Sequence, residues 1–294
     1  MNGTTDKSSS RARTLRQRAA SSFLWRGIQI ARDRHRLASV PTLACDVGAL
    51  RRVTASDLQR LLASDRIHAD WATAGDELAK LCAVEDGATG SANPGDRRAI
   101  YYLIRGFAPA TVLEIGTHVG VSTLYIAKAL EPGERSPAAT PALTTVDVEA
   151  VNDPETGSWK QLGLTMAPKD RLAALGCGDR VRFVNADSVE FLDGCRERFD
   201  FIFLDGDHTS STVYREIPRA LRLLEPDGVI LLHDYFPDNR PLWPGARIDP
   251  GPFLATQRLR RDEPALAVLP LGELPWETKR DSKITNLAVL TRNR

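Results

Sequence analysis

Short apolar, often β-branched runs recur along the middle of the chain, with longer helix-like stretches between them. Five of these runs predict strands, at residues 111–115, 143–148, 181–186, 199–205 and 228–234. Because apolar strands alternate with helices, the pattern predicts a parallel sheet covered on both faces. The last apolar segments, 265–274 and 284–292, are joined by a turn-rich connection and predict an antiparallel hairpin at the sheet edge.

The first ninety residues show helical spacing without strand-like runs. Residues 56–86 have an acidic-apolar helical pattern, and residues 97–107 predict another helix after a loop rich in Gly, Pro and Asn. We therefore divide the chain into a disordered tail (1–10), a helical N-terminal extension (11–90) and a doubly wound α/β domain (91–294).

Composition fits a globular enzyme-sized chain of 294 residues, 42% hydrophobic and 26% charged. Apolar runs all fall short of the ~20 residues that cross a bilayer, and the N-terminus does not resemble a secretory signal, so we expect a cytoplasmic protein. The cysteines stand far apart without a C-x-x-C motif, which indicates reduced thiols rather than disulfides or a metal site.

Charge is distributed unevenly. Residues 1–40 contain nine basic and two acidic side chains, so this segment has a net charge of +7. The whole chain has a net charge of +1, which leaves −6 for the remaining residues. Within residues 11–38 apolar positions can form one helix face while arginines cover another. We expect this helix to pack on the body of the protein or on a partner subunit in a homo-oligomer, in preference to a membrane surface or nucleic acid.

The predicted strands end in glycine or acidic residues. In a doubly wound sheet the ligand lies beyond these carboxyl ends. Residues 111–122, TVLEIGTHVGVS, form a strand, a glycine turn and a helix start, but the turn lacks the middle glycine of the dinucleotide-binding G-x-G-x-x-G pattern. An acidic edge also disfavours a pyrophosphate. The pattern therefore favours a phosphate-free ligand with a cationic centre.

Four ordered motifs at these strand ends carry a resemblance: LEIGTHVGVSTL, TTVDV, FDFIFLDGDH and LLEPDGVILLHDY. Over about residues 95–235 the chain resembles class I S-adenosylmethionine-dependent methyltransferases, in particular small-molecule O-methyltransferases related to the catechol and macrolide-sugar enzymes. The resemblance implies a Rossmann-like fold, S-adenosylmethionine as cofactor and a small molecule with a hydroxyl group, such as a natural product or sugar, as methyl acceptor.

The same resemblance implies roles in the glycine turn. Gly116 and Gly120 would let the backbone approach the methionyl part of the cofactor, and Thr117 would also border the cofactor. Ser122 would lie near its carboxylate, and an anion at a helix N-terminus also makes physical sense. Glu114 would face the amino group through water, unless this carboxylate only orients its own loop.

Further along the chain, Asp147 would accept hydrogen bonds from the ribose hydroxyls, and Asp187 and Ser188 would lie against the adenine edge. Capping of a following helix is the alternative for each of these positions. Asp205 would also border the cofactor. We interpret His118 as a loop side chain rather than a catalytic one.

The metal-dependent branch of the resembled family implies a divalent site here. Asp205, His233 and Asp234 would hold Mg²⁺ or Mn²⁺, with His233 departing from the oxygen ligand usual at its position. His208 would be the general base, three residues after Asp205. For Asp205, His233 and Asp234 the alternative is a site without a metal. For His208 the alternative is a structural role in the loop.

We therefore expect a methyltransferase that acts on a hydroxyl group of a small molecule, assisted by a divalent metal. Metal-independent methylation of another acceptor, and a non-catalytic partner protein that binds S-adenosylmethionine, stay open. The residues after His208, TSST, depart from the aromatic and acidic residues often found there, so the acceptor is left undetermined.

Overall fold

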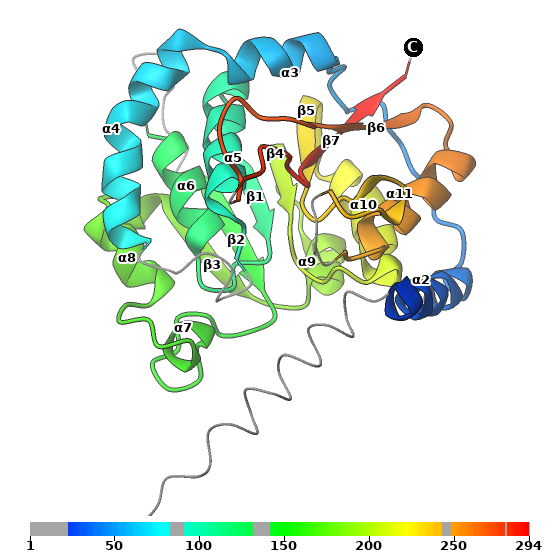
Figure 1. Ribbon diagram of the computed structural model, residues 1–294. Helices are drawn as coiled ribbons and strands as arrows, with labels where there is room; N and C mark the ends of the chain where they lie inside the picture. The colour runs from blue at the N-terminus through cyan, green and yellow to red at the C-terminus, as the bar shows by residue number, and fades with distance from the viewer. Residues whose placement is uncertain (1–22, 83–90, 132–141, 243–247, 280, 294) are drawn as a thin grey trace, which may run out of the picture.

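The computed structural model describes residues 23–82, 91–131, 142–242, 248–279 and 281–293. They contain a seven-stranded sheet with the order β3-β2-β1-β4-β5-β7-β6 (Figure 1). Its strands are β1 (Val112–Ile115), β2 (Leu143–Asp147), β3 (Val181–Asn185), β4 (Phe199–Leu204), β5 (Leu224–Leu232), β6 (Leu266–Pro270) and β7 (Ala288–Arg292).

Strands β1 to β5 are parallel, and β7 runs antiparallel to both β5 and β6. This confirms the predicted mixed sheet with an antiparallel C-terminal hairpin, in which β6 forms the edge. The strand order reverses between β1 and β4, whose ends pair through Ile115 and Leu204. The carboxyl ends of these two strands are where a doubly wound sheet opens a ligand crevice.

Helices cover both faces of the sheet. The helices of eight or more residues are α2 (Phe23–Ala38), α3 (Ala55–Leu62), α4 (Asp65–Leu81), α5 (Pro94–Phe107), α6 (Val121–Ala129), α10 (Ser210–Arg222) and α11 (Gly251–Asp262). The shorter ones are α7 (Ser158–Gln161), α8 (Pro168–Ala174) and α9 (Ser188–Gly194), with 3₁₀ turns at Gly178–Arg180 and Pro237–Asn239.

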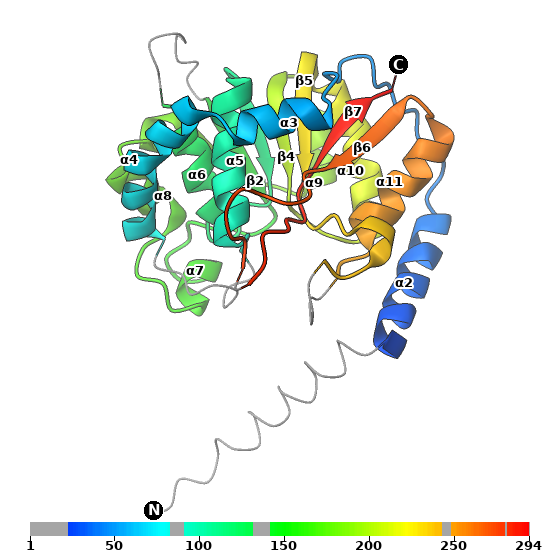
Figure 2. The same ribbon diagram turned by 45° about the horizontal axis from the view of Figure 1, so that its top comes forward.

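Alternate strand residues enter two separate cores, because successive side chains of a strand point to opposite faces. Val112 and Phe203 pack in the core beneath α3 to α6 and α8. Leu113 and Leu204 pack in the core beneath α9 to α11 and α2. Figure 2 shows these two helical layers on either side of the sheet.

The N-terminal extension folds onto the domain. Instead of one helical segment at 56–86, the structure has α3 and α4, because two separate caps start them. Thr54 and Asp57 form a reciprocal capping box at α3, and the Ser64 side chain accepts from the Ile67 amide at α4. Helix α2 lies against α10 and α11. The predicted tail and residues 11–22 lie outside the described residues.

Among the described residues, no helix has the length and apolar composition needed to cross a membrane.

Candidate active site

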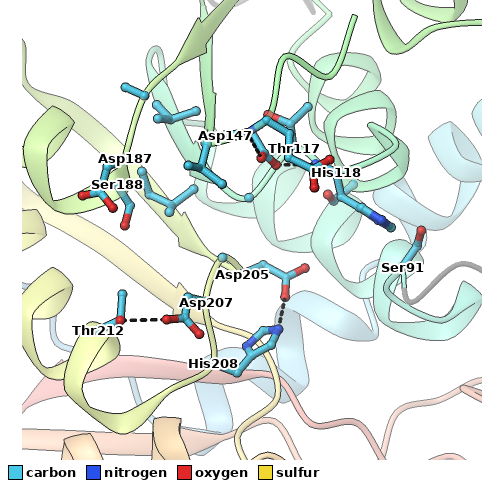
Figure 3. A pocket seen from close by; sticks show the side chains of 18 of the residues that line it. Ser91, Thr117, His118, Asp147, Asp187, Ser188, Asp205, Asp207, His208 and Thr212 are labelled. Atoms are coloured by element: carbon cyan, nitrogen blue, oxygen red, sulfur yellow. Dashed lines mark hydrogen bonds and ion pairs between the residues drawn. The ribbon is translucent and has the colours of Figure 1, made fainter. Parts of the chain in front are cut away.

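A cavity of about 580 Å³ opens at the carboxyl ends of β1, β2, β3 and β4. It is bordered by the glycine turn, by the ends of these strands and by the segment before α5. Figure 3 shows Ser91 near His118, with Asp187 and Ser188 on another side of the cavity. Of the predicted site residues, the cavity lining includes Gly116, Thr117, Ser122, Asp147, Asp187, Ser188, Asp205 and His208.

The glycine turn needs its glycines for two different close contacts. Gly116 has φ +97°, and a Cβ there would lie 2.2 Å from the Asp205 carbonyl oxygen. Gly120 has φ +71°, and its Cβ would lie 2.7 Å from Cβ of Pro168. Gly116 thus lets the ends of β1 and β4 approach closely, whereas Gly120 lets the start of α6 pack on α8 and is outside the cavity lining.

Glu114 is fully buried beneath this turn and outside the cavity lining. Its Oε2 accepts hydrogen bonds from the hydroxyls of Thr123 at 2.6 Å and Thr145 at 2.7 Å. Burial raises the pKa of this carboxyl to about 7, although the surrounding hydroxyls oppose the shift. These contacts favour the alternative in which Glu114 orients its own loop.

Asp147 connects the end of β2 to the glycine turn. Its two oxygens accept backbone N–H bonds from His118 at 2.7 Å and Glu149 at 2.8 Å. The carboxylate is therefore held in one orientation on the cavity wall, with lone pairs left for further donors. It does not cap a helix, so the capping alternative for Asp147 is wrong.

Asp187 does cap a helix while also lining the cavity. Its Oδ1 accepts from the amides of Val189 and Glu190 at the start of α9. Ser188 follows directly on the same wall. Behind Ser188, burial raises the pKa of Glu216 to about 7, against the opposing hydrogen bond from Ser188.

The segment after β4 is stabilised by its own side chains. Asp207 accepts from the Thr209 amide at 3.0 Å and from the hydroxyls of Thr209 and Thr212 at 2.9 and 2.8 Å. This network explains the TSST sequence: its threonines close the turn that carries His208. Sequence analysis missed Thr212 as a cavity residue and gave Asp207 no role, although the Asp-x-Thr spacing of a side-chain turn was a usable signal.

Asp205 and His208 line one end of the cavity, and Asp234 converges with them from outside the cavity lining. Nε2 of His208 lies 3.4 Å from Oδ2 of Asp234 and 3.8 Å from Oδ1 of Asp205. One ligand atom from each residue lies within 4.8 Å of the others, and no other group of three His, Cys, Asp or Glu side chains in the described ranges converges so closely. The two carboxylates fit a divalent cation such as Mg²⁺ or Mn²⁺, and the imidazole beside them can act as a base or as a further ligand.

His233 occupies a different place from the one predicted. It is buried, with Nδ1 2.9 Å from Asp205 Oδ1 and Nε2 3.5 Å from Oδ2 of Asp96, so it lies behind the three converging groups. Burial opposes its charged form, but Asp205 and Asp234 raise the pKa of His233 well above its ordinary value. His208 thus joins Asp205 and Asp234 on the cavity side, while His233 contacts the same two carboxylates from the buried side.

The contact with His233 also changes the pKa of Asp234. Burial alone would raise the pKa of Asp234, but the charge of His233 holds it well below its usual range. Asp234 has φ +50°, and Asn286 donates from Nδ2 to its Oδ1 at 2.5 Å. Asn286 precedes β7, and no local sequence signal connects it with Asp234.

The chain is similar to known methyltransferases. Residues 113–235 match the family model described as "Methyltransferase domain". A protein of Mycobacterium sp. (strain JLS), named as a candidate O-methyltransferase, is 28% identical over 172 residues, which cover 56% of this chain and 68% of the relative.

Two solved structures are also similar. The candidate O-methyltransferase from Klebsiella pneumoniae has a TM-score of 0.50 at 18% identity, with 90% of this chain and 97% of that chain covered, which supports the fold. An O-methyltransferase from Bacillus cereus in complex with SAH has a TM-score of 0.48 at 19% identity, with 90% and 97% covered.

Proposed function

We propose that this protein transfers a methyl group from S-adenosylmethionine to a hydroxyl group of a small molecule, with the help of a divalent ion; the match of residues 113–235 to the family model described as "Methyltransferase domain" supports the methyl transfer. The observation that carries the proposal is the placement of Asp147, Asp187 and Asp205 around one cavity that ends at His208, which contacts Asp234. The cavity volume of about 580 Å³ lies in the range of small-molecule sites.

Cofactor binding follows from the geometry of the walls. The oriented carboxylate of Asp147 can accept hydrogen bonds from ribose hydroxyls, and the Asp187–Ser188 corner can contact the adenine edge. The start of α6 at Ser122 offers backbone N–H groups to the cofactor carboxylate. Bound S-adenosylmethionine supplies a methyl group on a positively charged sulfur, which suits the acidic edge.

Deprotonation of the acceptor is assigned to His208. As the hydroxyl attacks the methyl group, its proton passes to Nε2 of His208, which faces the carboxylate of Asp234. Asp205 and Asp234 would hold the divalent ion, which supplies positive charge that lowers the pKa of a nearby hydroxyl. We propose a cytoplasmic setting and a small-molecule partner, without a nucleic-acid substrate.

A specific observation favours metal-independent transfer as the second candidate. His233 already places positive charge between Asp205 and Asp234, at 2.9 and 3.6 Å from their Oδ1 atoms. Because His233 supplies this positive charge, Nε2 of His208 can accept the proton of the acceptor hydroxyl beside the same two carboxylates without a metal ion.

Methyl-labelled S-adenosylmethionine and a panel of phenolic, catecholic and sugar hydroxyl compounds test the function. We expect label in an acceptor, loss of transfer after chelator treatment, and recovery with Mg²⁺ or Mn²⁺. Full activity of verified metal-free protein would establish the second candidate instead. Cofactor binding in calorimetry without transfer to any acceptor would point to a non-catalytic binding protein.

A further inference from the structure

The N-terminal helix α2 contacts the segment that carries His208. In the sequence this helix stood out for its arginines, and the function proposed above gives it no role. In the structure it packs on α10 and α11 (Figures 1 and 2). Its Asp33 reaches Ser210, the first residue of α10 and only two positions after His208.

Asp33 supplies the cap that α10 lacks from its own sequence. Thr209 occupies the N-cap position, but its hydroxyl accepts no backbone N–H of α10 and bonds instead to the side chains of Asp207 and Thr212. Instead, the Ser210 amide donates to Oδ1 of Asp33 at 3.0 Å, and the Ser210 hydroxyl donates to the Asp33 carbonyl at 2.7 Å. Ser210 is fully buried, so water cannot replace these partners.

The opposite side of the same segment is closed by α11. A Cβ at Gly251, the first residue of α11, would lie 2.0 Å from the His208 carbonyl oxygen and 2.6 Å from the Ser210 nitrogen. Helix α11 is in turn tied to α2, because Arg258 donates to the carbonyls of Leu37 and Val40. Residues 208–210 are thus held between two helices that are joined to each other.

We propose that Asp33 is a positioning residue for the methyl-transfer reaction: by fixing Ser210, it sets the direction in which His208 faces Asp205 and Asp234. The role of His208 rests on the function proposed above. The contacts of Asp33 with Ser210 do not depend on that function. Helix α2 is then a working part of the active site, contributed from a position 177 residues before Ser210.

Asp33→Ala and Asp33→Asn test this proposal. Loss of a helix cap should free residues 208–212, so Asp33→Ala should speed their amide hydrogen exchange and lower the single-turnover methyl-transfer rate, each by about tenfold. Affinity for S-adenosylhomocysteine should stay within about twofold, because Asp147, Asp187 and Ser188, which would contact the cofactor, lie at the ends of β2 and β3. Asn keeps an oxygen acceptor and should restore most of both properties.

Thr54→Ala is the matched control, since it removes the cap of α3, another helix of the N-terminal extension. It should lower stability without changing exchange at residues 208–212. If Asp33→Ala does not fold, Ser210→Ala takes its place, because it removes only the hydroxyl contact with Asp33. It should speed exchange at residues 208–212 and lower the methyl-transfer rate by less than about tenfold.

The proposal is overturned if folded Asp33→Ala exchanges and transfers like the unaltered protein, or if Thr54→Ala reproduces its effects. Should the unaltered protein transfer no methyl group, the proposed function fails, and the exchange of residues 208–212 alone decides whether Asp33 holds this segment.

Discussion

Carboxylates at the strand ends differ in what already binds them. Asp147 accepts two backbone N–H groups and still lines the cavity, whereas Glu114 is enclosed by threonine hydroxyls beneath it. The first arrangement fixes a charged group for a ligand. The second holds a carboxyl group in a place that disfavours its charge. These differences give separate predictions for single substitutions.

Asp147→Ala should weaken binding of S-adenosylhomocysteine by about 1–3 kcal/mol, because ribose hydroxyls then lose a buried acceptor. Isothermal calorimetry measures the change. Asp153→Ala is a matched control, since Asp153 also accepts two backbone amides, from Glu155 and Thr156, but lies outside the cavity lining. Equal affinities of the two variants would remove Asp147 from the binding site.

His208→Gln should lower the single-turnover methyl-transfer rate by roughly 10²- to 10⁴-fold and remove the imidazole limb of the pH–rate profile. Affinity for the cofactor should change little. Binding of Mn²⁺, followed by electron paramagnetic resonance, should also persist, because Asp205 and Asp234 remain. Loss of Mn²⁺ binding would make His208 a metal ligand rather than the base.

Glu114→Gln should change how stability depends on pH. The pKa of Glu114 is raised to about 7 in the folded protein, so the unfolded chain loses this proton at a lower pH than the folded one. The free energy of unfolding should therefore fall as pH rises from about 4.5 to 7, by roughly 3 kcal/mol from this group. Urea unfolding at pH 5 and pH 8 should show that the free energy of unfolding falls less in the variant than in the unaltered protein. An equal fall in both proteins would exclude Glu114 as the source of the pH dependence.

Among the elements, β1 and β4 depend on one close approach. Gly116→Ala places a methyl group against the Asp205 carbonyl and should cost more than 2 kcal/mol of stability, with weaker cofactor binding. Gly163 also has a positive φ, +75°, but nothing lies within 4 Å of its Cβ position. Gly163→Ala should therefore cost only about 1 kcal/mol in urea unfolding. Similar losses in both variants would show that the contact between the strands is unimportant.

Local patterns predicted most elements well, and their ends less well. The glycine turn and α6 agree with the sequence pattern, since a strand, a glycine and a helix are neighbours in the chain. By contrast, β5 begins at Leu224, before the apolar run at 228, because Leu224 already pairs with Phe199 of β4; the pairing then shifts register and resumes at Val229. Hydrogen bonding to a neighbouring strand thus decided a boundary that hydrophobicity did not mark.

For the whole molecule, the convergence at Asp234 depends on the C-terminal hairpin. Asn286 comes from 52 residues farther along and donates to Asp234, while its carbonyl accepts from the Tyr235 amide. Asn286→Ala should weaken Mn²⁺ binding by about tenfold, because supporting contacts orient metal ligands. Titration followed by electron paramagnetic resonance measures this change. Unchanged Mn²⁺ affinity in the folded variant would show that Asp234 needs no such support.

The sequence by itself determined the alternating strands and helices, the antiparallel hairpin and the acidic strand ends around one edge. These features follow from side-chain periodicity and from turn chemistry, which act between near neighbours. Parallel strands then bring their ends together at that edge, so Asp147, Asp187 and Asp205 could be expected in one site before any side chain was placed.

Only the tertiary structure decided which of the two histidines beside the carboxylates reaches the cavity. His233 turns inward from the end of β5 toward Asp205 and Asp96, while the Asp207 turn brings His208 to the cavity. Side-chain direction beyond a strand depends on backbone conformation and on distant partners that sequence spacing does not reveal. For the same reason the contact between α2 and Ser210 could not be predicted, since it joins segments that folding alone brings together.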